Sequence, residues 1–300
     1  MKASKHSKQK SNTDTRKKIF QIAKEYSVLI FTVFIITSSI IQGSRVPTGS
    51  METTVMIGDW VMTNKLAYDL TTPRNIPFTD IELPHAKLFQ WGNPEKNDIV
   101  VFEFPGNRDM IKDTAIENYV KRCIGTPGDT IQIIDRVVFV NGKEFPIPPH
   151  IQYLRNKSYP DYYAEENIFP KGSGWNCDNY GPLVVPKKGE VIELNKSNIQ
   201  KWDTFINREF ERRAVELKDG KIFIDGKETN KYTVKDDYYF MMGDNRDNSL
   251  DSRYWGFVPR RNVVGTPMFV YFSWNSDIPW SRFFDLVSSI RIDRIGKLVH

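Results

Sequence analysis

A long apolar run lies near the start of the chain. Residues 26–44, YSVLIFTVFIITSSIIQGS, contain no charged side chain. As a helix rising about 1.5 Å per residue, the run would span roughly 28 Å, close to the hydrocarbon thickness of a bilayer. Because lipid cannot satisfy the polar groups of an irregular backbone, the whole run is expected to be helical. The pattern therefore predicts a membrane-spanning helix.

Two other interpretations of this run stay open. A cleavable secretory signal also has a basic start and a short apolar core, and the strongly apolar part, residues 28–36, is short enough for one. A helix buried in the protein core would be apolar as well. A retained anchor, which we favour, and a cleaved signal both place the remaining chain outside the cytoplasm.

After residue 50 the pattern changes to short runs of β-branched and aromatic residues, which are typical of strands. These runs cover residues 98–104, 119–125, 130–134, 136–140, 221–224, 238–242 and 263–274. VNGK at 140–143 and DGK at 225–227 predict tight hairpin turns. The body of the chain is therefore expected to be mostly β.

Two segments depart from the strand pattern. Residues 197–217 carry four apolar residues at helical spacing after a candidate N-cap at Ser197. They are Ile199, Trp202, Ile206 and Phe210. This helix lies within residues 142–235, a stretch rich in Pro, Tyr, Lys and Asn that we interpret as a subdomain inserted into the β scaffold. Residues 278–300 are basic and aromatic, and fit either a helix lying on a membrane or a closing helix packed on the body.

Charge adds an orientation to this picture. The chain has 300 residues, 40% hydrophobic and 13% aromatic, enough for a core in one large or two modest domains. Its net charge of +5 arises in residues 1–18, where seven basic residues face only Asp14. Such a basic segment stays on the cytoplasmic side of a membrane span. Nucleic acid is not an expected partner, because the folded body carries no basic excess.

The cysteines and histidines give little support for a metal site. Cys123 and Cys177 could form one disulfide, but two cysteines define neither a disulfide framework nor a four-ligand zinc site. We favour the alternative, in which they are two small buried side chains. The sequence contains no Cys/His cluster and no glycine-rich phosphate loop, so no metal and no nucleotide cofactor is expected.

Candidate chemistry begins just past the apolar run. In VPTGSMETTVMIGDW, residues 46–60, Ser50 lies between Gly49 and Met51 and could act as a nucleophile. The usual base for a serine is histidine, but none of the four histidines stands in a motif-like setting. They are His6, His85, His150 and His300.

Lys121 is an alternative base. It lies in mid-strand in NYVKRCIGTPGD, residues 118–129, among apolar neighbours. Most strand lysines face solvent, but in an apolar pocket the charged form is disfavoured and the pKa falls from its ordinary value. A neutral lysine amine could accept the proton of a serine hydroxyl, and serine–lysine pairs are a known variant of serine catalysis.

A third stretch, MGDNRDNSLDSRYWGFVP at residues 242–259, is dense in polar groups between two apolar strands. A surface loop would explain this polarity but not the abrupt apolar sequel YWGFVP. Carboxylates and arginines packed this closely indicate a hydrogen-bonded turn that is buried against the body.

Together these stretches resemble the bacterial type I signal peptidases, membrane-bound serine proteases that remove signal peptides from exported proteins. VPTGSM resembles their nucleophile box, GDWVMTNKLAY the following strand, DIVVFEFP and YVKRCIGTPGD the base-bearing boxes, and GDNRDNSLDSRYWGFVP the last box. The boxes lie in residues 46–68, 98–129 and 242–265, about a quarter of the chain.

The resemblance implies a mostly β fold, in which an N-terminal transmembrane helix precedes an antiparallel β catalytic domain of the signal peptidase/LexA-like type with an inserted α+β subdomain. The expected parts are a basic cytoplasmic tail (1–25), a transmembrane anchor (26–44), a catalytic domain (45–141 and 236–300) and the inserted subdomain (142–235).

The resemblance also implies roles for single residues. Ser50 would be the nucleophile and Lys121 the general base. The backbone N–H of Ser50 and the hydroxyl of Thr48 would hold the oxyanion. Ser249 would hydrogen-bond the lysine amine and orient it.

Further residues would support the site or bind substrate. Asp251 and Arg253 would form an ion pair in the last box. Shallow pockets for the small residues before the cut would be lined by Val46, Pro47, Met51, Tyr119 and Val120. Two positions depart from the family pattern: Thr53 stands where proline is usual, and Thr48 where many members have serine. These departures concern the rigidity of the loop and the rotamer of the oxyanion donor, since the threonine methyl restricts it.

The implied function is that of a membrane-anchored serine endopeptidase, a hydrolase that cleaves signal peptides after small residues of the Ala-X-Ala type. It would be a single-pass protein of the bacterial cytoplasmic membrane, with its N-terminus inside and its catalytic domain outside. The expected partners are signal-peptide-bearing preproteins and membrane lipid, with the secretion translocon as a further candidate.

Two other functions fit part of the pattern. A self-cleaving regulator of the LexA type shares a Ser-Lys pair on a related β fold, but a membrane span and the lack of a DNA-binding module count against it. A membrane-tethered pseudo-enzyme would bind preproteins without cutting them, and Thr53 is the one hint of it.

Overall fold

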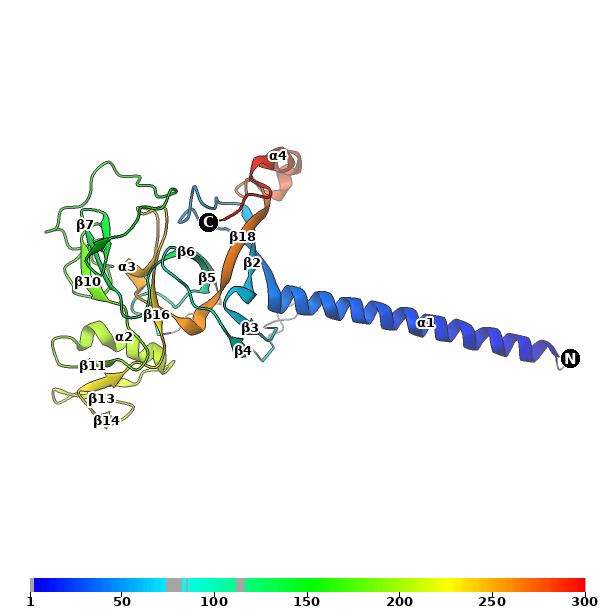
Figure 1. The fold of residues 1–300 in the computed structure, drawn as a ribbon, viewed down its shortest axis with the longest axis horizontal. Coiled ribbons are helices and arrows are strands. Elements are labelled where there is room, and N and C mark those ends of the chain that lie inside the picture. Colours follow the sequence, from blue (N-terminus) through cyan, green and yellow to red (C-terminus); the bar gives the residue numbers. More distant parts are fainter. Residues whose placement is uncertain (1–2, 74–82, 85, 112–116, 300) are drawn as a thin grey trace.

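The structure is a computed structural model that describes residues 3–73, 83–84, 86–111 and 117–299, with side chains from residue 17 onward. The side chains of most of the basic tail, His85 and His300 lie outside the described residues. Figure 1 shows a β-rich body from which one long helix projects.

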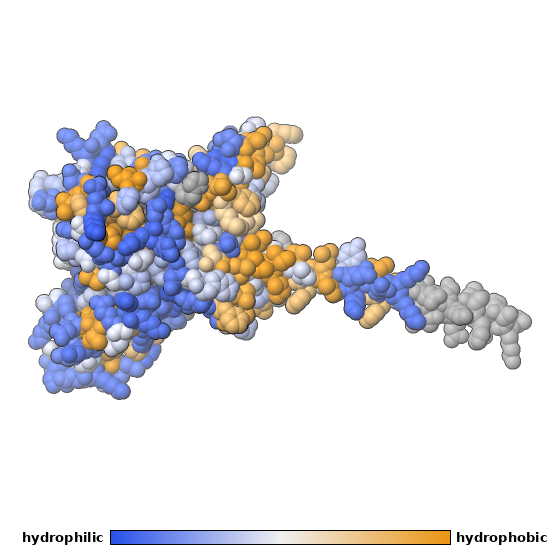
Figure 2. Space-filling model, in the orientation of Figure 1, coloured by the Kyte–Doolittle hydropathy of each residue, from blue (hydrophilic) through white to orange (hydrophobic). Residues whose placement is uncertain are grey.

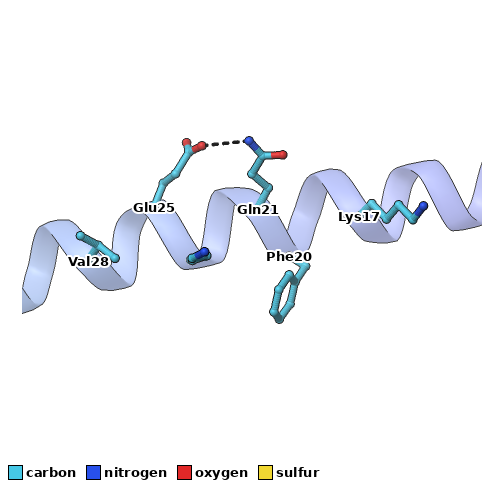
Figure 3. A pocket seen from close by; sticks show the side chains of 6 residues that line it. Lys17, Phe20, Gln21, Glu25 and Val28 are labelled. Atoms are coloured by element: carbon cyan, nitrogen blue, oxygen red, sulfur yellow. Dashed lines mark hydrogen bonds between the residues drawn. The ribbon is translucent and has the colours of Figure 1, made fainter.

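The projecting helix is α1 (Ala3–Ile35), and a π-helical turn (Ile36–Ile40) continues it. Within Lys17–Ile40, the most apolar window of 18 residues has a mean hydropathy of 1.7, and none of it is buried against the body. The core-helix interpretation is therefore wrong. Figure 2 shows apolar side chains on the part of α1 next to the body and polar ones farther out. Figure 3 shows this polar part, where a shallow depression is lined by α1 alone and Gln21 donates a hydrogen bond to Glu25 (3.3 Å).

The helix begins before the predicted range, at Ala3, but it ends earlier than predicted, because residues 41–44 are not helical. They belong to β1 (Ile41–Arg45), which pairs with β2 (Asp59–Asn64). Gly43 is a poor helix former, and the sheet supplies hydrogen-bond partners for the backbone of this segment. Buried Lys65 donates a hydrogen bond from Nζ to the Ser38 carbonyl oxygen (2.6 Å) and so holds the π-helical turn on the body.

In the described part of the chain the largest sheet has seven strands, in the order β1–β2–β18–β5–β6–β16–β17. Its other strands are β18 (Val263–Ser273), β5 (Ile99–Glu103), β6 (Asn118–Gly125), β16 (Tyr238–Met242) and β17 (Val258–Pro259). The pairings between these strands are antiparallel. This sheet carries the predicted strands 98–104, 119–125, 238–242 and 263–274, which are confirmed.

Smaller antiparallel sheets complete the body. One contains β10 (Tyr180–Val184), β7 (Thr130–Ile134), β8 (Val137–Val140) and β9 (Lys143–Glu144). Another contains β12 (Val215–Lys218), β13 (Lys221–Ile224) and β14 (Lys227–Glu228). Two pairs join β11 (Val191–Glu193) to β15 (Lys231–Thr233) and β3 (Asp69–Thr71) to β4 (Lys87–Gln90). Both predicted hairpin turns are confirmed, with Asn141–Gly142 and Asp225–Gly226 at positive φ as such turns require.

The predicted helix within 197–217 is present but ends early. It is α2 (Ile199–Glu209), and residues 215–218 form β12 instead. Ser197 is not the cap: the Asn195 side chain accepts hydrogen bonds from the backbone N–H groups of Ser197 and Asn198. The four predicted apolar residues face the core, with Ile199 and Ile206 buried and Trp202 and Phe210 packed against it.

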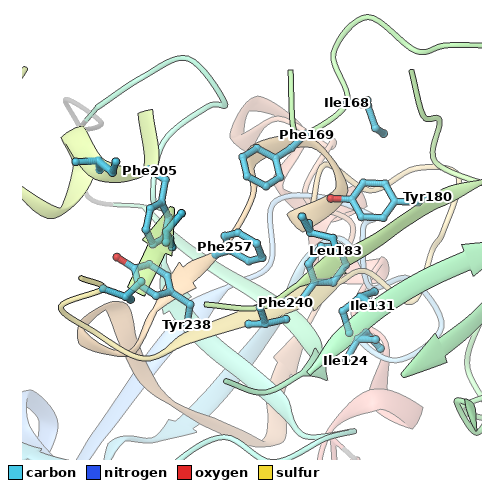
Figure 4. Packing of buried hydrophobic residues seen from close by; sticks show 14 of the residues in the cluster. Ile124, Ile131, Ile168, Phe169, Tyr180, Leu183, Phe205, Tyr238, Phe240 and Phe257 are labelled. Carbon is cyan, nitrogen blue, oxygen red and sulfur yellow. The ribbon is translucent and has the colours of Figure 1, made fainter. Parts of the chain in front are cut away.

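The main core joins the stretch 142–235 to the large sheet. In Figure 4, Phe205 of α2 meets Tyr238 of β16 and Phe257, with a ring-centroid distance of 4.7 Å between Phe205 and Tyr238. Ile124 of β6 belongs to the same cluster. Residues 142–235 therefore pack on the strands that carry the candidate site, on the side of the body away from α1 (Figure 1).

The segment after β18 is neither of the two single helices considered. It contains a 3-10 turn (Trp280–Arg282), a short helix α4 (Phe283–Ser288) and a second 3-10 turn (Ile292–Arg294). Of α4 only Leu286 is buried, and Phe284 is 85% exposed. Three further short elements are the 3-10 turns Lys65–Ala67 and Arg260–Asn262 and the helix α3 (Ser252–Trp255).

Candidate active site

Ser50 lies in a loop that closes on itself. We call residues 46–59 the Ser50 loop. Its ends are joined by hydrogen bonds from Val46 N to Asp59 O (2.8 Å) and from Gly58 N to Val46 O (3.0 Å). Inside it, the Met51 carbonyl oxygen accepts hydrogen bonds from Thr54 N and Val55 N. The loop is thus a compact unit between β1 and β2, and it holds the buried Ser50 at its first turn.

Lys121 lies opposite Ser50, on β6 in the middle of the large sheet. Its Nζ is 2.6 Å from Ser50 Oγ and 3.1 Å from the Val120 carbonyl oxygen. The side chain is buried, and its amine stands 5.3 Å from the ring centre of Tyr119. Burial lowers the pKa of Lys121 to about 8, against the opposing charges of Asp251 and Asp244. A neutral amine is therefore accessible near physiological pH.

The last box holds the backbone around Ser50. Asn245 N donates a hydrogen bond to the Ser50 carbonyl oxygen, and Asn245 Nδ2 donates one to the Gly49 carbonyl oxygen, each at 3.1 Å. Gly243 lies directly under this contact, since a Cβ built there would come within 2.5 Å of Ser50 O. Only a residue without a side chain fits at this position.

Asp251 and Arg253 form a buried, two-pronged ion pair. Arg253 donates from Nε to Asp251 Oδ1 (2.9 Å) and from Nη2 to Asp251 Oδ2 (2.8 Å). Asp251 Oδ2 also accepts a hydrogen bond from Gly243 N (3.1 Å). Burial by itself would raise the pKa of Asp251, but the charge and hydrogen bonds of Arg253 outweigh it and keep that pKa below its ordinary value. The pair therefore stays ionised and fixes the turn that contains Gly243.

Ser249 does not take the position expected for it. Among the described residues, Lys121 Nζ donates to Ser50 Oγ and to the Val120 carbonyl oxygen, and the expected hydrogen bond to Ser249 is absent. Ser249 lies close enough to Asp251 to contribute to the lowered pKa of that carboxylate. The turn thus directs the Ser249 hydroxyl toward the ion pair, and Lys121 is positioned by its strand and by Ser50.

Sequence reasoning missed a second buried network, which ties the Ser50 loop to the strand of Lys121. Arg122 donates from Nε and Nη2 to the two carboxylate oxygens of Asp244 (2.9 and 2.8 Å). Asp244 Oδ2 also accepts a hydrogen bond from the Thr54 hydroxyl (2.6 Å). The sequence signal for this network was Arg122, a second cation directly after Lys121 on a strand with apolar neighbours.

The five residues expected to contact substrate differ in how much surface they offer. Met51 is only 1% exposed and packs beneath the loop, so it offers a substrate almost no surface. Val46 is also buried, whereas Pro47 is exposed and Tyr119 and Val120 are half-buried beside Lys121. The Tyr119 ring is stacked on Phe104 with a centroid distance of 4.5 Å. Thr48, the expected oxyanion donor, is exposed two residues before Ser50.

Thr53 has a backbone conformation that proline cannot adopt. Its φ is +79°, whereas the proline ring holds φ near −65°. The Thr53 hydroxyl donates a hydrogen bond to the His150 carbonyl oxygen (2.6 Å) and so links the Ser50 loop to the stretch 142–235. Proline at this position would therefore require a different local backbone.

We expect Thr53→Pro, which restores the usual family residue, to destabilise this protein. The ring cannot reach positive φ, so the fold should lose more than about 1 kcal/mol, and cleavage should slow several-fold. Thr53→Gly is the matched control, because glycine accepts this φ without strain. Thermal unfolding of both variants measures the effect. An unchanged midpoint for the proline variant would show that this loop does not need the observed backbone.

Comparisons with known proteins agree with the resemblance seen in the sequence. Residues 19–274 match the family described as "Signal peptidase, peptidase S26". Signal peptidase I of Buchnera aphidicola subsp. Schizaphis graminum is 30% identical over 299 residues, which cover 95% of this chain and 83% of that protein. Signal peptidase I of Rickettsia typhi is 28% identical over 304 residues, covering 96% and 97%. The crystal structure of a signal peptidase I from Enterococcus faecalis V583 aligns with 58% of this chain and 97% of that one, at 21% identity and a TM-score of 0.29.

Proposed function

This chain belongs to the S26 family of signal peptidases, serine peptidases that act on signal-peptide-bearing preproteins, and we propose that it cuts them with Ser50 as nucleophile and Lys121 as general base. The observation that carries this proposal is the 2.6 Å approach of Lys121 Nζ to Ser50 Oγ in a buried setting. No other described histidine, lysine or carboxylate makes a hydrogen bond to that hydroxyl.

The reaction would proceed through an acyl-enzyme. Neutral Lys121 takes the Ser50 proton as Oγ attacks the carbonyl carbon of the scissile peptide bond. The resulting ammonium then protonates the leaving amine, so the peptide bond breaks and the N-terminal fragment stays esterified to Ser50. Lys121, neutral again, takes a proton from water as the water oxygen attacks the ester carbonyl. The ester bond then breaks, Lys121 returns the proton to Ser50 Oγ, and the signal peptide leaves with its new carboxylate.

The developing oxyanion needs donors beside Ser50. We assign the backbone N–H of Ser50 and the hydroxyl of Thr48 to this task. Thr48 is exposed at the start of the same turn, so its hydroxyl is accessible to a bound substrate. One such donor typically contributes about a hundred- to a thousandfold in rate.

The substrate would bind as an extended strand in front of Lys121, with main-chain hydrogen bonds and alternate side chains in shallow pockets. Pro47, Tyr119 and Val120 offer surface there. The family resemblance implies a preference for Ala-X-Ala at the cleavage site. In this arrangement residues 45–141 and 236–300 form the catalytic domain, and residues 142–235 form an insertion packed on it.

The apolar helix would anchor the protein in the bacterial cytoplasmic membrane, with the N-terminus inside and the body outside. It is long and apolar enough to span a bilayer, and it projects free of the body. The basic residues that precede it support this orientation. Signal peptides emerge at the same membrane face, so lipid and the translocon would be neighbours of the site.

Incubation of the detergent-solubilised protein with a preprotein tests the function. We expect a shortened product whose new N-terminus follows an Ala-X-Ala sequence, as determined by mass spectrometry. Replacing the last alanine of the signal peptide by a large residue should block cleavage. A preprotein that is bound but never shortened would favour the pseudo-enzyme, and autolysis as the only reaction would favour the self-cleaving regulator.

The rate of cleavage should rise with pH. Lys121 acts as a base only when it has lost its proton, and its pKa is about 8. We therefore expect kcat/KM to be about 1% of its plateau at pH 6, to increase roughly tenfold per pH unit, and to level off above pH 8. Initial rates in a constant-ionic-strength buffer series measure this profile. A flat profile between pH 6 and pH 9 would contradict a lysine base.

A further inference from the structure

The segment after α4 returns beneath the Ser50 loop. Arg291 N donates a hydrogen bond to Ser273 O (3.0 Å), and Gly296 N donates one to Val270 O (2.8 Å). Val299 packs in a small apolar cluster with Val46 and Met51 of the Ser50 loop. Residues 291–299 thus form the underside of the loop, although they lie more than 230 positions away along the sequence.

Arg294 joins this segment to the loop through a buried ion pair. Its Nη2 donates to Asp59 Oδ2 (2.5 Å) and to the Thr54 carbonyl oxygen (3.3 Å). Asp59 is completely buried, and its carboxylate also accepts hydrogen bonds from Met56 N (2.8 Å) and the Ser273 hydroxyl (2.7 Å). The arginine is itself 5% exposed. Because the Asp59 carboxylate is held by this ion pair and by two further hydrogen bonds, the position of the end of the Ser50 loop is fixed.

Arg291 adds contacts to the same side of the loop. Its Nη2 donates to the carbonyl oxygens of Ile57 (2.5 Å) and Trp274 (2.6 Å). Both arginines therefore bind carbonyl or carboxylate groups in residues 54–59, the half of the loop that follows Ser50.

Thr54 connects this contact to the base. Its carbonyl oxygen accepts from Arg294, while its hydroxyl donates to Asp244, which in turn binds Arg122 next to Lys121. The loop is thus held from below by Arg294 and from the sheet by Asp244. Loss of the hydrogen bond from Arg294 or of the one to Asp244 would leave the turn from Met51 to Thr54 free to shift relative to Lys121.

We propose that Arg294 is a positioning residue for Ser50, which holds the loop through Asp59 and Thr54 so that Ser50 Oγ stays within hydrogen-bond reach of Lys121. The inference rests on the proposed function and deepens it. Arg294 touches neither Ser50 nor Lys121, so its effect must pass through the backbone of the loop. It should therefore change the chemical step and leave substrate binding alone.

Arg294→Ala tests this proposal. We expect kcat to fall about tenfold with KM within twofold of the wild type, because a small displacement of the nucleophile slows the chemistry without altering the binding surface. Guanidinium, added far below denaturing concentrations, should restore most of the lost kcat by occupying the vacated site beside Asp59. Sodium at the same ionic strength should not. Lys297→Ala is the matched control, since it removes an exposed charge from the same segment.

Arg294→Lys covers the case in which the alanine variant does not fold. A lysine can reach Asp59 but cannot also bind Thr54 O in the same plane, so a reduced kcat with unchanged KM is again expected. A folded variant of either kind with wild-type kcat, or a kcat loss in the alanine variant that guanidinium does not reverse, would overturn the proposal. Failure of the wild-type protein to cut any preprotein would instead refute the proposed function.

Discussion

Replacing Lys121 by methionine is expected to reduce the rate of preprotein cleavage by about ten-thousandfold or more. When two residues act as one catalytic unit, removing either one loses nearly all of the rate enhancement that the pair provides. Methionine has a similar length and removes the only amine within hydrogen-bond distance of Ser50 Oγ among the described residues. Ser50→Ala should lower the rate equally, and the double variant no further. Single-turnover kinetics with excess enzyme give the residual rate.

The same substitution should make the protein more stable. In the folded state burial lowers the pKa of Lys121 from 10.5 to about 8, so below pH 8 a charged amine is buried. A shift of this size corresponds to about 3 kcal/mol of destabilisation, which is fully present below pH 8 and is relieved as the pH rises toward 10.5. Methionine removes this cost and loses two hydrogen bonds. We expect a net gain of about 1 kcal/mol at pH 7, seen as a higher unfolding midpoint.

Lys221→Met is the matched control. Lys221 also lies in a strand, β13, but its side chain is 60% exposed and pairs with Glu228 at the surface. Removing such a pair changes stability by at most about 1 kcal/mol, and activity should stay at the wild-type level. A Lys121→Met protein that is folded, free of contaminating protease and still active would refute the proposed base.

Gly243→Ala is expected to abolish most activity while adding only one methyl group. The new Cβ would collide with the Ser249 hydroxyl and come within 2.5 Å of the Ser50 carbonyl oxygen. The backbone of the Ser50 loop must then move, and a displacement of about 1 Å at the nucleophile can cost a hundredfold in rate. Assays of kcat with a preprotein, together with the unfolding midpoint, measure the two consequences.

A second glycine serves as the control that separates the steric collision at Gly243 from the general effect of replacing a glycine by alanine. Gly226, in the β13–β14 hairpin, has a φ of +77°, and a Cβ added there would meet no atom within 4 Å. Gly226→Ala therefore introduces backbone strain of about 1 kcal/mol far from the site and should leave kcat unchanged. Equal activity losses in the two variants would mean that the close approach of Gly243 to Ser50 is not what limits catalysis.

Much of the β body could be predicted because its signals are local. Runs of β-branched and aromatic residues marked the strands, and Asn-Gly and Asp-Gly marked two hairpins, since both depend on neighbouring residues alone. The helix boundaries failed for a non-local reason. Residues 41–44 are uncharged and continue the apolar run, but β2 provides them with a pairing partner. Residues 215–217 likewise leave the helical pattern to pair with β13.

The candidate site divides in the same way. Ser50 and Lys121 stand in stretches that could be singled out from residue types, and the structure places them together. Ser249 lies in such a stretch too, but the direction of its hydroxyl depends on how the Asp251–Arg253 pair turns the chain. Arg294 and Asp59 carried no sequence signal, because an ion pair across 235 positions is set by the path of the chain through the whole sheet.

The passage from α1 to β1 has a mechanical consequence. The π-helical turn is hydrogen-bonded to Lys65, and β1, the edge strand of the large sheet, follows it directly. No linker residue separates the two elements. A tilt of the helix would therefore be passed on to β1 and, through it, to the position of Ser50. From Ile40 to Ser50 the chain spans one five-residue strand and a tight turn, roughly 17 Å for the strand. With α1 in a bilayer, the tilt of the helix would thus determine the distance between Ser50 and the membrane surface, and so the distance from the lipid at which a peptide bond can be cut.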